Sequence, residues 1–212
     1  MSLVIAGILI TGSMLFHPDD SIPANTLRTA WVPVHILLGI AALAGLAGLG
    51  GLYFVMNAKL STFGRVSFGL SLLGTVLLVG VLLFFEATLL PVLDRDPAYQ
   101  PLLSGNGSIM NGPFGYAVWV SMVIVSVGYV LLALYLVSSK TISIANGLLF
   151  IGVPLVSFAP PIPYALEILG GVLFGAALIW LGVSVRRGTA HEALTADLRI
   201  QDECIAHAGS RA

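Results

Sequence analysis

Three ionisable side chains of this sequence lie within long apolar stretches, and their types and positions could do chemistry. They are His35, Glu86 and Glu167. An ionisable group inside a membrane-spanning helix is costly to bury, so it normally faces the interior of a helix bundle or a water-filled cavity. At the rise of about 1.5 Å per residue of an α-helix, each lies roughly 6–8 Å from the end of its stretch that is expected at the outer face of the membrane. We therefore predict that the three form one polar cluster near the outer face of a membrane.

Imidazole and carboxylate groups together suit several kinds of chemistry. They can bind zinc, iron, manganese or copper, and three protein ligands with one open position are typical of catalytic zinc. They can relay protons, as intramembrane carboxylates do in transporters. A carboxyl group in an apolar site has a raised pKa and can act as a general acid. The candidate ligands of a metal or a haem are His17, His35, Glu86 and Glu167, of which the two histidines could be axial haem ligands.

Simpler interpretations stand beside these. His35 could only form a hydrogen bond to a neighbouring helix. Glu86 and Glu167 could extend to the nearby membrane surface, and His17, which precedes a proline, could be a loop residue. The sequence contains no H-E-x-x-H, Walker loop, G-x-G-x-x-G after a strand or G-x-S-x-G motif. It therefore identifies no catalytic residue and no cofactor.

The composition predicts the setting in which these side chains are held. Of 212 residues, 58% are hydrophobic and 9% are charged, against about 45–50% and 25% in soluble domains. Because so few charges cannot cover a water-facing surface, most of the surface is expected to contact the lipid bilayer. We therefore expect a multi-pass protein of a plasma or inner membrane. The net charge of -1 gives no attraction to nucleic acid. A single cysteine, Cys204, excludes a metal site built from several cysteines.

Apolar stretches set the predicted helices, because crossing the bilayer takes about 20 apolar residues. Four stretches are long enough, and two shorter ones, 1–16 and 142–158, are interpreted as spans as well. The fold class predicted is all-α, a bundle of six transmembrane helices over residues 1–187. A polar tail, 188–212, follows as a short surface helix or a disordered end. The six predicted spans are 1–16, 30–56, 66–90, 114–137, 142–158 and 163–185.

Basic residues predict the orientation of this bundle. Six spans place seven basic residues on one side and two, Arg28 and Arg95, on the other. Cytoplasmic loops carry the excess of lysine and arginine, so both termini are expected in the cytoplasm. The seven on the cytoplasmic side are Lys59, Arg65, Lys140, Arg186, Arg187, Arg199 and Arg211.

The outer loops and the small residues of the helices carry further signals. The outer loops, 17–29, 91–113 and 159–162, are richer in proline and acidic residues than the inner ones, and loops are where function tends to concentrate. Gly171 and Gly175 form a G-x-x-x-G pair, which permits close helix packing within the bundle or in a homo-oligomer.

Three functions are compatible with these features. Small size and glycine-rich helices favour a binding or accessory subunit of a membrane complex, or self-assembly. The polar cluster favours an ion or proton transporter, which would need Ser71, Thr75, Asn146 or water to continue the path inward. It also suits a membrane-embedded enzyme acting on a lipid-like substrate, with a glutamate as general acid or base.

Overall fold

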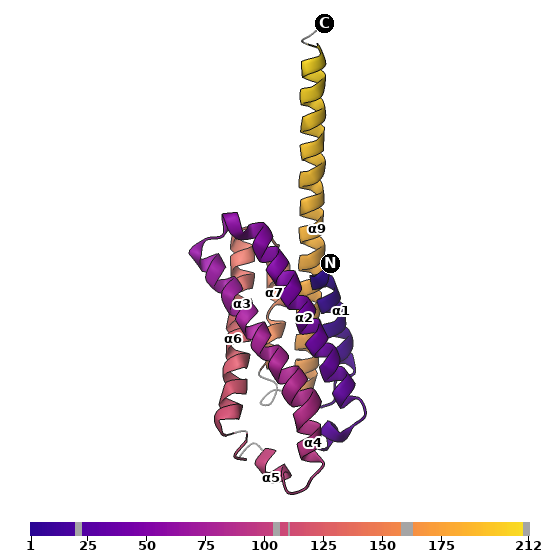
Figure 1. Ribbon diagram of the computed structural model, residues 1–212, viewed down its shortest axis with the longest axis vertical. Coiled ribbons are helices and arrows are strands. Elements are labelled where there is room, and N and C mark those ends of the chain that lie inside the picture. Colours follow the sequence, from indigo (N-terminus) through magenta and orange to yellow (C-terminus); the bar gives the residue numbers. More distant parts are fainter. Residues whose placement is uncertain (20–22, 104–106, 110, 158–162, 210–212) are drawn as a thin grey trace.

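The computed structural model describes residues 1–19, 23–103, 107–109, 111–157 and 163–209, without the side chains of 23, 24 and 188–209 (Figure 1). In these residues the chain forms helices joined by turns, and no strand. The elements are α1 (Ser2–Leu15), η1 (Pro23–Leu27), α2 (Trp31–Met56), η2 (Asn57–Lys59), α3 (Thr62–Gly80), η3 (Val81–Leu89), α4 (Leu90–Asp94), α5 (Gln100–Leu103), α6 (Pro113–Ser138), α7 (Ile144–Leu149), α8 (Gly152–Ser157) and α9 (Tyr164–Gly209).

Four helical segments of the described chain are long and apolar enough to cross a membrane: Trp31–Lys59, Thr62–Asp94, Pro113–Ser138 and Tyr164–Arg187. Large apolar side chains such as Phe54 are exposed on the outside of the bundle, as contact with lipid requires. The predicted all-α fold is confirmed, with four segments that could span a membrane by length and composition. The two shorter apolar segments, Ser2–Leu15 and Ile144–Ser157, leave the count of six spans a prediction.

The structure differs from the sequence prediction in the fifth stretch, 142–158. Two short helices, α7 and α8, replace one span, with a turn at Phe150 and Ile151 between them. Pro154 explains the break, because its ring clashes with the carbonyl four residues earlier while the first turn of a helix tolerates proline. The sequence marks this proline, but not the backbone path around it.

The third long segment is also irregular. A nine-residue π-helix, η3, joins α3 to α4, and the N–H of Leu90 donates to the carbonyl oxygen of Phe85. Pro91 follows at once and has no N–H to donate, so one backbone carbonyl near the end of this segment loses its helical hydrogen bond. π-Helical turns are rare and frequent at functional sites, and this one carries Glu86.

Helix ends account for the remaining boundaries. Ser61 and Ser143 cap α3 and α7 by accepting backbone N–H bonds at 3.2 Å. α6 ends just before Lys140, whose φ of 59° is a left-handed conformation that closes helices.

The predicted outer loop 91–113 begins later than expected because α4 continues to Asp94, and the loop contains α5. α9 runs on through the predicted tail to Gly209, whereas the predicted turn 159–162 lies outside the described residues.

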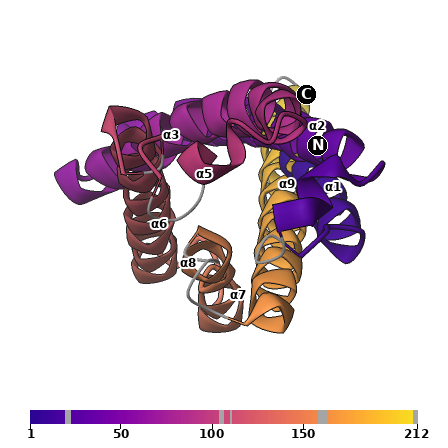
Figure 2. The ribbon, with the colours of Figure 1, turned by 90° about the horizontal axis from the view of Figure 1, so that it is seen from below.

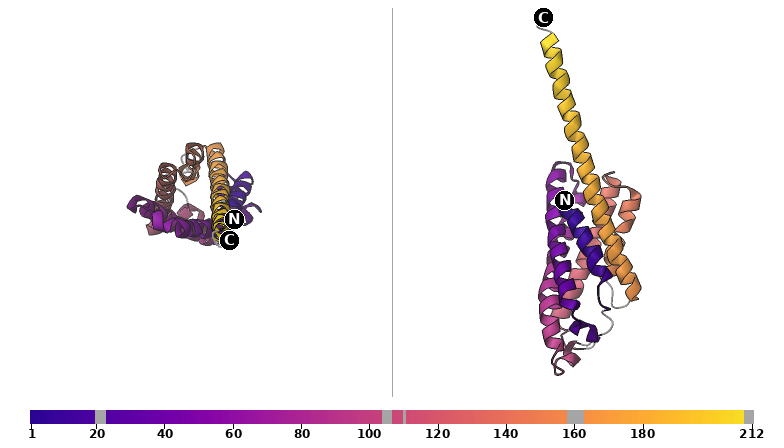
Figure 3. Two further views of the ribbon diagram at one scale, coloured as in Figure 1. Left: turned by 90° about the horizontal axis from the view of Figure 1, so that it is seen from above. Right: turned by 90° about the vertical axis from the view of Figure 1, so that its right-hand side faces the viewer.

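The apolar segments form a closed ring, which is visible along the bundle in Figure 2 and from the opposite end in Figure 3. α1 packs against both α2 and α9; α3 packs against α2 and α6; and α8 packs against α6 and α9.

Glycines allow the neighbouring helices of this ring to approach closely. A Cβ atom on Gly175 would lie 2.7 Å from the backbone oxygen of Gly7, and one on Gly171 would meet the Met14 side chain. The predicted G-x-x-x-G pair therefore packs α9 against α1 within this chain. Homo-oligomerisation, the alternative role of these glycines, stays a prediction.

Candidate functional site

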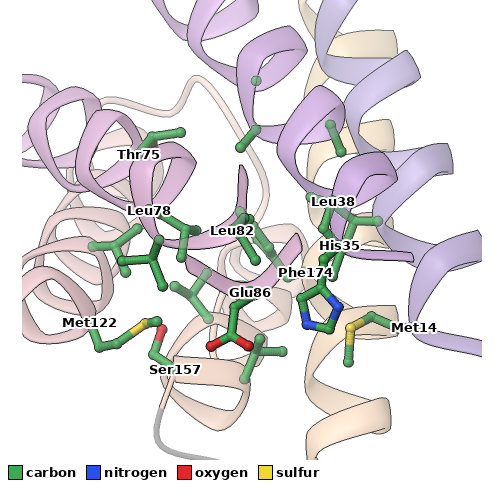
Figure 4. A pocket seen from close by; sticks show the side chains of 18 of the residues that line it. Met14, His35, Leu38, Thr75, Leu78, Leu82, Glu86, Met122, Ser157 and Phe174 are labelled. Carbon is green, nitrogen blue, oxygen red and sulfur yellow. The ribbon is translucent and has the colours of Figure 1, made fainter. Parts of the chain in front are cut away.

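A cavity of about 240 Å³ lies inside the ring, and every apolar segment contributes to its wall. Met14 of α1, Leu38 of α2, Leu82 of η3, Met122 of α6 and Phe174 of α9 are among its apolar lining residues (Figure 4). The polar and ionisable residues on the wall are His17, His35, Thr75, Glu86, Trp119, Tyr129, Ser157 and Glu167.

The cavity is elongated along the helices, and its polar groups lie toward its two ends. Its lining runs from His35 to Gly45 on α2 and from Glu167 to Leu178 on α9, which is about 15 Å at the α-helical rise. One end carries the histidines and glutamates. At the other end the hydroxyl groups of Thr75 and Tyr129 are hydrogen-bonded at 3.0 Å. The walls between the ends are mostly aliphatic and aromatic.

His17 and His35 contact one another at the first of these ends. Their Nε2 atoms lie 3.3 Å apart, and the residues are only 5% and 3% exposed. The backbone oxygen of Trp31 lies 2.9 Å from His35 Nδ1 and can only accept, so Nδ1 carries the proton. When both rings are neutral, His35 Nε2 is therefore the acceptor and His17 Nε2 the donor. Trp31 also stacks on His35, with ring centroids 4.4 Å apart.

Glu167 extends this contact to the start of α9. Its Oε1 atom lies 3.7 Å from Nδ1 of His17, and the residue is 5% exposed. The hydroxyl of Tyr164 donates to the backbone oxygen of His17, so the end of α1 is fixed to the first turn of α9. Burial and the neighbouring His35 lower the pKa of His17 to about 4, so this imidazole is neutral at neutral pH.

Glu86 reaches the same end of the cavity from the π-helix. In Figure 4 its carboxylate and the His35 imidazole lie beside one another on the cavity wall. The indole N–H of Trp31 donates to the backbone oxygen of Glu86 at 2.8 Å. One aromatic residue of α2 therefore contacts both His35 and the backbone that positions Glu86.

All four residues singled out from the sequence line this cavity. His17 contacts His35 and lies 3.7 Å from Glu167, and Glu86 lines the same end of the cavity from the π-helix. Among the described residues, no group of three or more His, Cys, Asp or Glu side chains is arranged to hold a metal ion. Roles as metal or haem ligands stay predictions.

Sequence reasoning missed the residues that position these groups. Trp31 lies four residues before His35, a spacing that places both on one helix face and could have identified their contact. Thr75 was predicted only as part of a polar path, and its partner Tyr129 lies 54 residues away in the chain. No local pattern predicts that pairing.

No protein-family model, curated protein or solved structure matches this chain.

Proposed function

We propose that this protein binds a lipid-like molecule inside the membrane. The cavity enclosed by the ring carries this proposal. It is about 15 Å long in all, mostly aliphatic and aromatic between its ends, and polar at the end that carries His35, Glu86 and Glu167. Ligand sites are mostly apolar, with a few polar groups that fix the orientation of the ligand. The apolar part of the ligand lies along the aliphatic walls, and its polar end meets the imidazoles and carboxylates.

The proposal places this polar end toward the outer face of the membrane. The ring contains six apolar segments, including the short α1 and the α7–α8 pair. If all six cross, basic residues concentrate on the side opposite the histidines and glutamates, which is the cytoplasmic side. The ligand then enters from the outer leaflet, and both termini are cytoplasmic.

Cysteine accessibility tests this placement. Cys204, the one native cysteine, is expected to react with a membrane-impermeant maleimide in inside-out vesicles and to be protected in right-side-out vesicles. In a Cys204→Ser background, Ser2→Cys is expected to show the same sidedness and Asp96→Cys the opposite one. Opposite sidedness of positions 2 and 204 would show an odd number of crossings and overturn the six-span arrangement.

Photo-crosslinking tests ligand binding. The probe is dodecanol with a diazirine in its alkyl chain, added to protein in lipid nanodiscs, with labelled peptides located by mass spectrometry. Labels are expected on cavity residues such as Met14, Met122 and Phe174. Labelling restricted to lipid-facing residues such as Phe54 would contradict the proposal.

A matched pair of variants provides the control. Ala42 lines the cavity, while Ala47 on the same helix is exposed on the outside. Ala42→Phe is expected to reduce cavity labelling strongly, and Ala47→Phe to leave it unchanged. Thermal unfolding of both variants, and the milder Ala42→Leu, separates a filled cavity from a misfolded protein.

A second candidate function is acid–base chemistry on the polar end of that ligand. It is favoured by the proximity of Glu167 Oε1 to His17 Nδ1, at 3.7 Å, because an acid–base pair that is longer than a hydrogen bond in the free protein can tighten when a ligand binds. Conversion of an isolated native ligand, lost in Glu167→Gln while binding persists, is the expected result. Unchanged conversion in that variant would remove Glu167 from the chemistry.

A further inference from the structure

The two imidazoles at the polar end of the cavity meet through nitrogens that can bind one metal ion. Nε2 of His17 and Nε2 of His35 lie 3.3 Å apart. Bonds of about 2.0–2.1 Å from one ion to both nitrogens span this separation at an angle of roughly 105–110°, which is close to tetrahedral. The ring centroids are 4.9 Å apart, closer than two rings aligned head-on through these atoms would be. The rings are therefore inclined to one another, as two imidazoles that share an ion require.

The opposite nitrogen of each ring is placed as in a metal-binding histidine. Metal-bound imidazoles almost always direct their other N–H to a carboxylate or a backbone carbonyl. His35 Nδ1 lies 2.9 Å from the backbone oxygen of Trp31, and His17 Nδ1 lies 3.7 Å from Oε1 of Glu167. The second distance must shorten by about 0.5–1 Å to become a hydrogen bond. Neutral His17 then carries its proton on Nδ1 instead of Nε2, which frees Nε2 for the ion without a net change in bound protons.

A thioether lies on the same turn as His17. Met14 precedes His17 by three residues, a spacing that brings side chains together on a helical turn, and the N–H of His17 donates to the Met14 carbonyl oxygen at 3.3 Å. Met14 is 1% exposed, and in Figure 4 its side chain lies beside the His35 imidazole on the cavity wall. A Cβ atom on Gly171 would lie 3.1 Å from Met14 Sδ, so the thioether occupies space that a larger residue of α9 would take.

The chemistry of these three donors selects the kind of ion. Thioether sulfur is a soft ligand that favours Cu(I), and imidazole suits copper as well as zinc, iron and nickel. Within the described part of the chain, no third His, Cys, Asp or Glu is placed to complete a metal-binding group with the two histidines. Two imidazoles and a thioether are neutral donors, and in an apolar cavity they favour a singly charged ion because burying a higher charge costs more.

We infer that Met14, His17 and His35 bind one Cu(I) ion at the polar end of the cavity. Glu167 is a positioning residue, which orients the His17 ring by accepting its Nδ1–H. The ion site goes beyond the proposed lipid binding and does not depend on it, since the apolar walls stay available to a hydrocarbon chain.

Competition with the chromophoric Cu(I) chelator bicinchoninate tests this site. The full-length protein is held in lipid nanodiscs with ascorbate, in a Cys204→Ser background because a thiol is itself a Cu(I) ligand. The protein is expected to withdraw one Cu(I) per chain from the chelator. Zn(II), measured against a zinc chelator, is expected to bind at least about tenfold more weakly. Zn(II) binding as tight as that of Cu(I) would overturn the choice of ion.

Paired variants locate the ion. His35→Ala is expected to weaken Cu(I) binding by about 100-fold or more, and Glu167→Gln by about tenfold, because removing the partner of a ligand typically costs about 10–100-fold. Met14→Leu keeps the apolar volume and is expected to weaken binding by about tenfold. Met122→Leu is the matched control, since Met122 lines the same cavity from α6, away from His35 in Figure 4, and is expected to change nothing.

Two further measurements separate loss of the site from loss of the fold. Cu(I) should raise the unfolding temperature of the parent protein and of Met122→Leu, and much less that of His35→Ala. X-ray absorption at the copper edge should show nitrogen and sulfur ligands in the parent protein, and nitrogen alone in Met14→Leu.

Each contrary outcome removes a defined part of the inference. Unchanged Cu(I) binding in His35→Ala overturns the site, and a sulfur ligand retained in Met14→Leu overturns the role of Met14. Failure of the parent protein to bind Cu(I), while the dodecanol probe still labels the cavity, overturns the ion site and leaves lipid binding standing. Cu(I) binding without cavity labelling overturns lipid binding and supports the ion site.

Discussion

The imidazoles of His17 and His35 are in direct contact across the ends of two different helices, with 3.3 Å between their Nε2 atoms. This contact joins α1 to α2 at the polar end of the cavity. Glu167 continues it to α9, and Trp31 continues it to the π-helix that carries Glu86. Four segments of the ring thus meet through a few buried polar groups, and disturbing one group should affect both stability and the cavity.

The hydrogen bond from Trp31 to Glu86 should contribute measurably to stability. Trp31 is 2% exposed, and its indole N–H donates to a backbone oxygen of the π-helix. Trp31→Phe leaves that oxygen without this donor, which should lower the free energy of unfolding by about 1–3 kcal/mol. The matched control is Trp180→Phe, because Trp180 is 44% exposed. Thermal unfolding in mild detergent measures both, and equal effects would contradict a role for the hydrogen bond.

The buried imidazole of His17 should make stability depend on pH. Its pKa is lowered to about 4 in the folded protein, against about 6.5 in an unfolded chain. Between these values the unfolded chain binds more protons, so stability is greatest above pH 6.5 and falls as the pH is lowered. The loss should approach about 1.4 kcal/mol per pH unit below the unfolded-state pKa.

The variant His17→Asn removes this titrating group. Unfolding temperatures of wild type and variant are compared between pH 6.5 and 5, above the range in which ordinary carboxylates titrate. We expect a steeper decline for the wild type, whatever the absolute stability of the variant. Parallel declines would show that another group causes the pH dependence.

Close packing of α6 against α3 should make Gly128 intolerant of a side chain. A Cβ atom there would lie 2.6 Å from the backbone nitrogen of Ser71. Gly128→Ala should therefore lower the free energy of unfolding by about 1–3 kcal/mol. Gly69→Ala on α3 is the control, since a Cβ at Gly69 meets nothing within 4 Å, and alanine should stabilise that helix by about 0.5–1 kcal/mol. Effects of the same sign would contradict the observed packing.

Replacing Asn146 with an apolar residue should not lower the free energy of unfolding, unlike most substitutions in the core. It is fully buried, and within the described part of the chain neither polar atom of its amide has a hydrogen-bond partner. Asn146→Leu removes this unsatisfied group and should leave stability unchanged or raise it by about 1–3 kcal/mol. The exposed Asn57→Leu should change stability by less than about 0.5 kcal/mol. A marked loss in Asn146→Leu would show that the amide binds a polar partner such as an ion.

Hydropathy was enough to predict the long apolar helices, whereas the common depth of three ionisable residues stays a prediction. A helix that crosses the bilayer satisfies its backbone internally and needs about 20 apolar residues, so its existence is a local property of the chain. The depth of His35, Glu86 and Glu167 follows from counting residues along such helices. The break before Gly152 was not predicted, because the stretch 142–158 was interpreted as one span although it contains Pro154.

The order of the segments around the ring, and therefore the cavity, depended on tertiary structure. Hydropathy records which residues leave water, and it does not record which segments become neighbours. Those neighbours are set by close approaches such as Gly128 against Ser71, which depend on shape complementarity between helices far apart in the chain. For the same reason the sequence could treat His17 as a loop residue, whereas packing α1 between α2 and α9 buries it against His35.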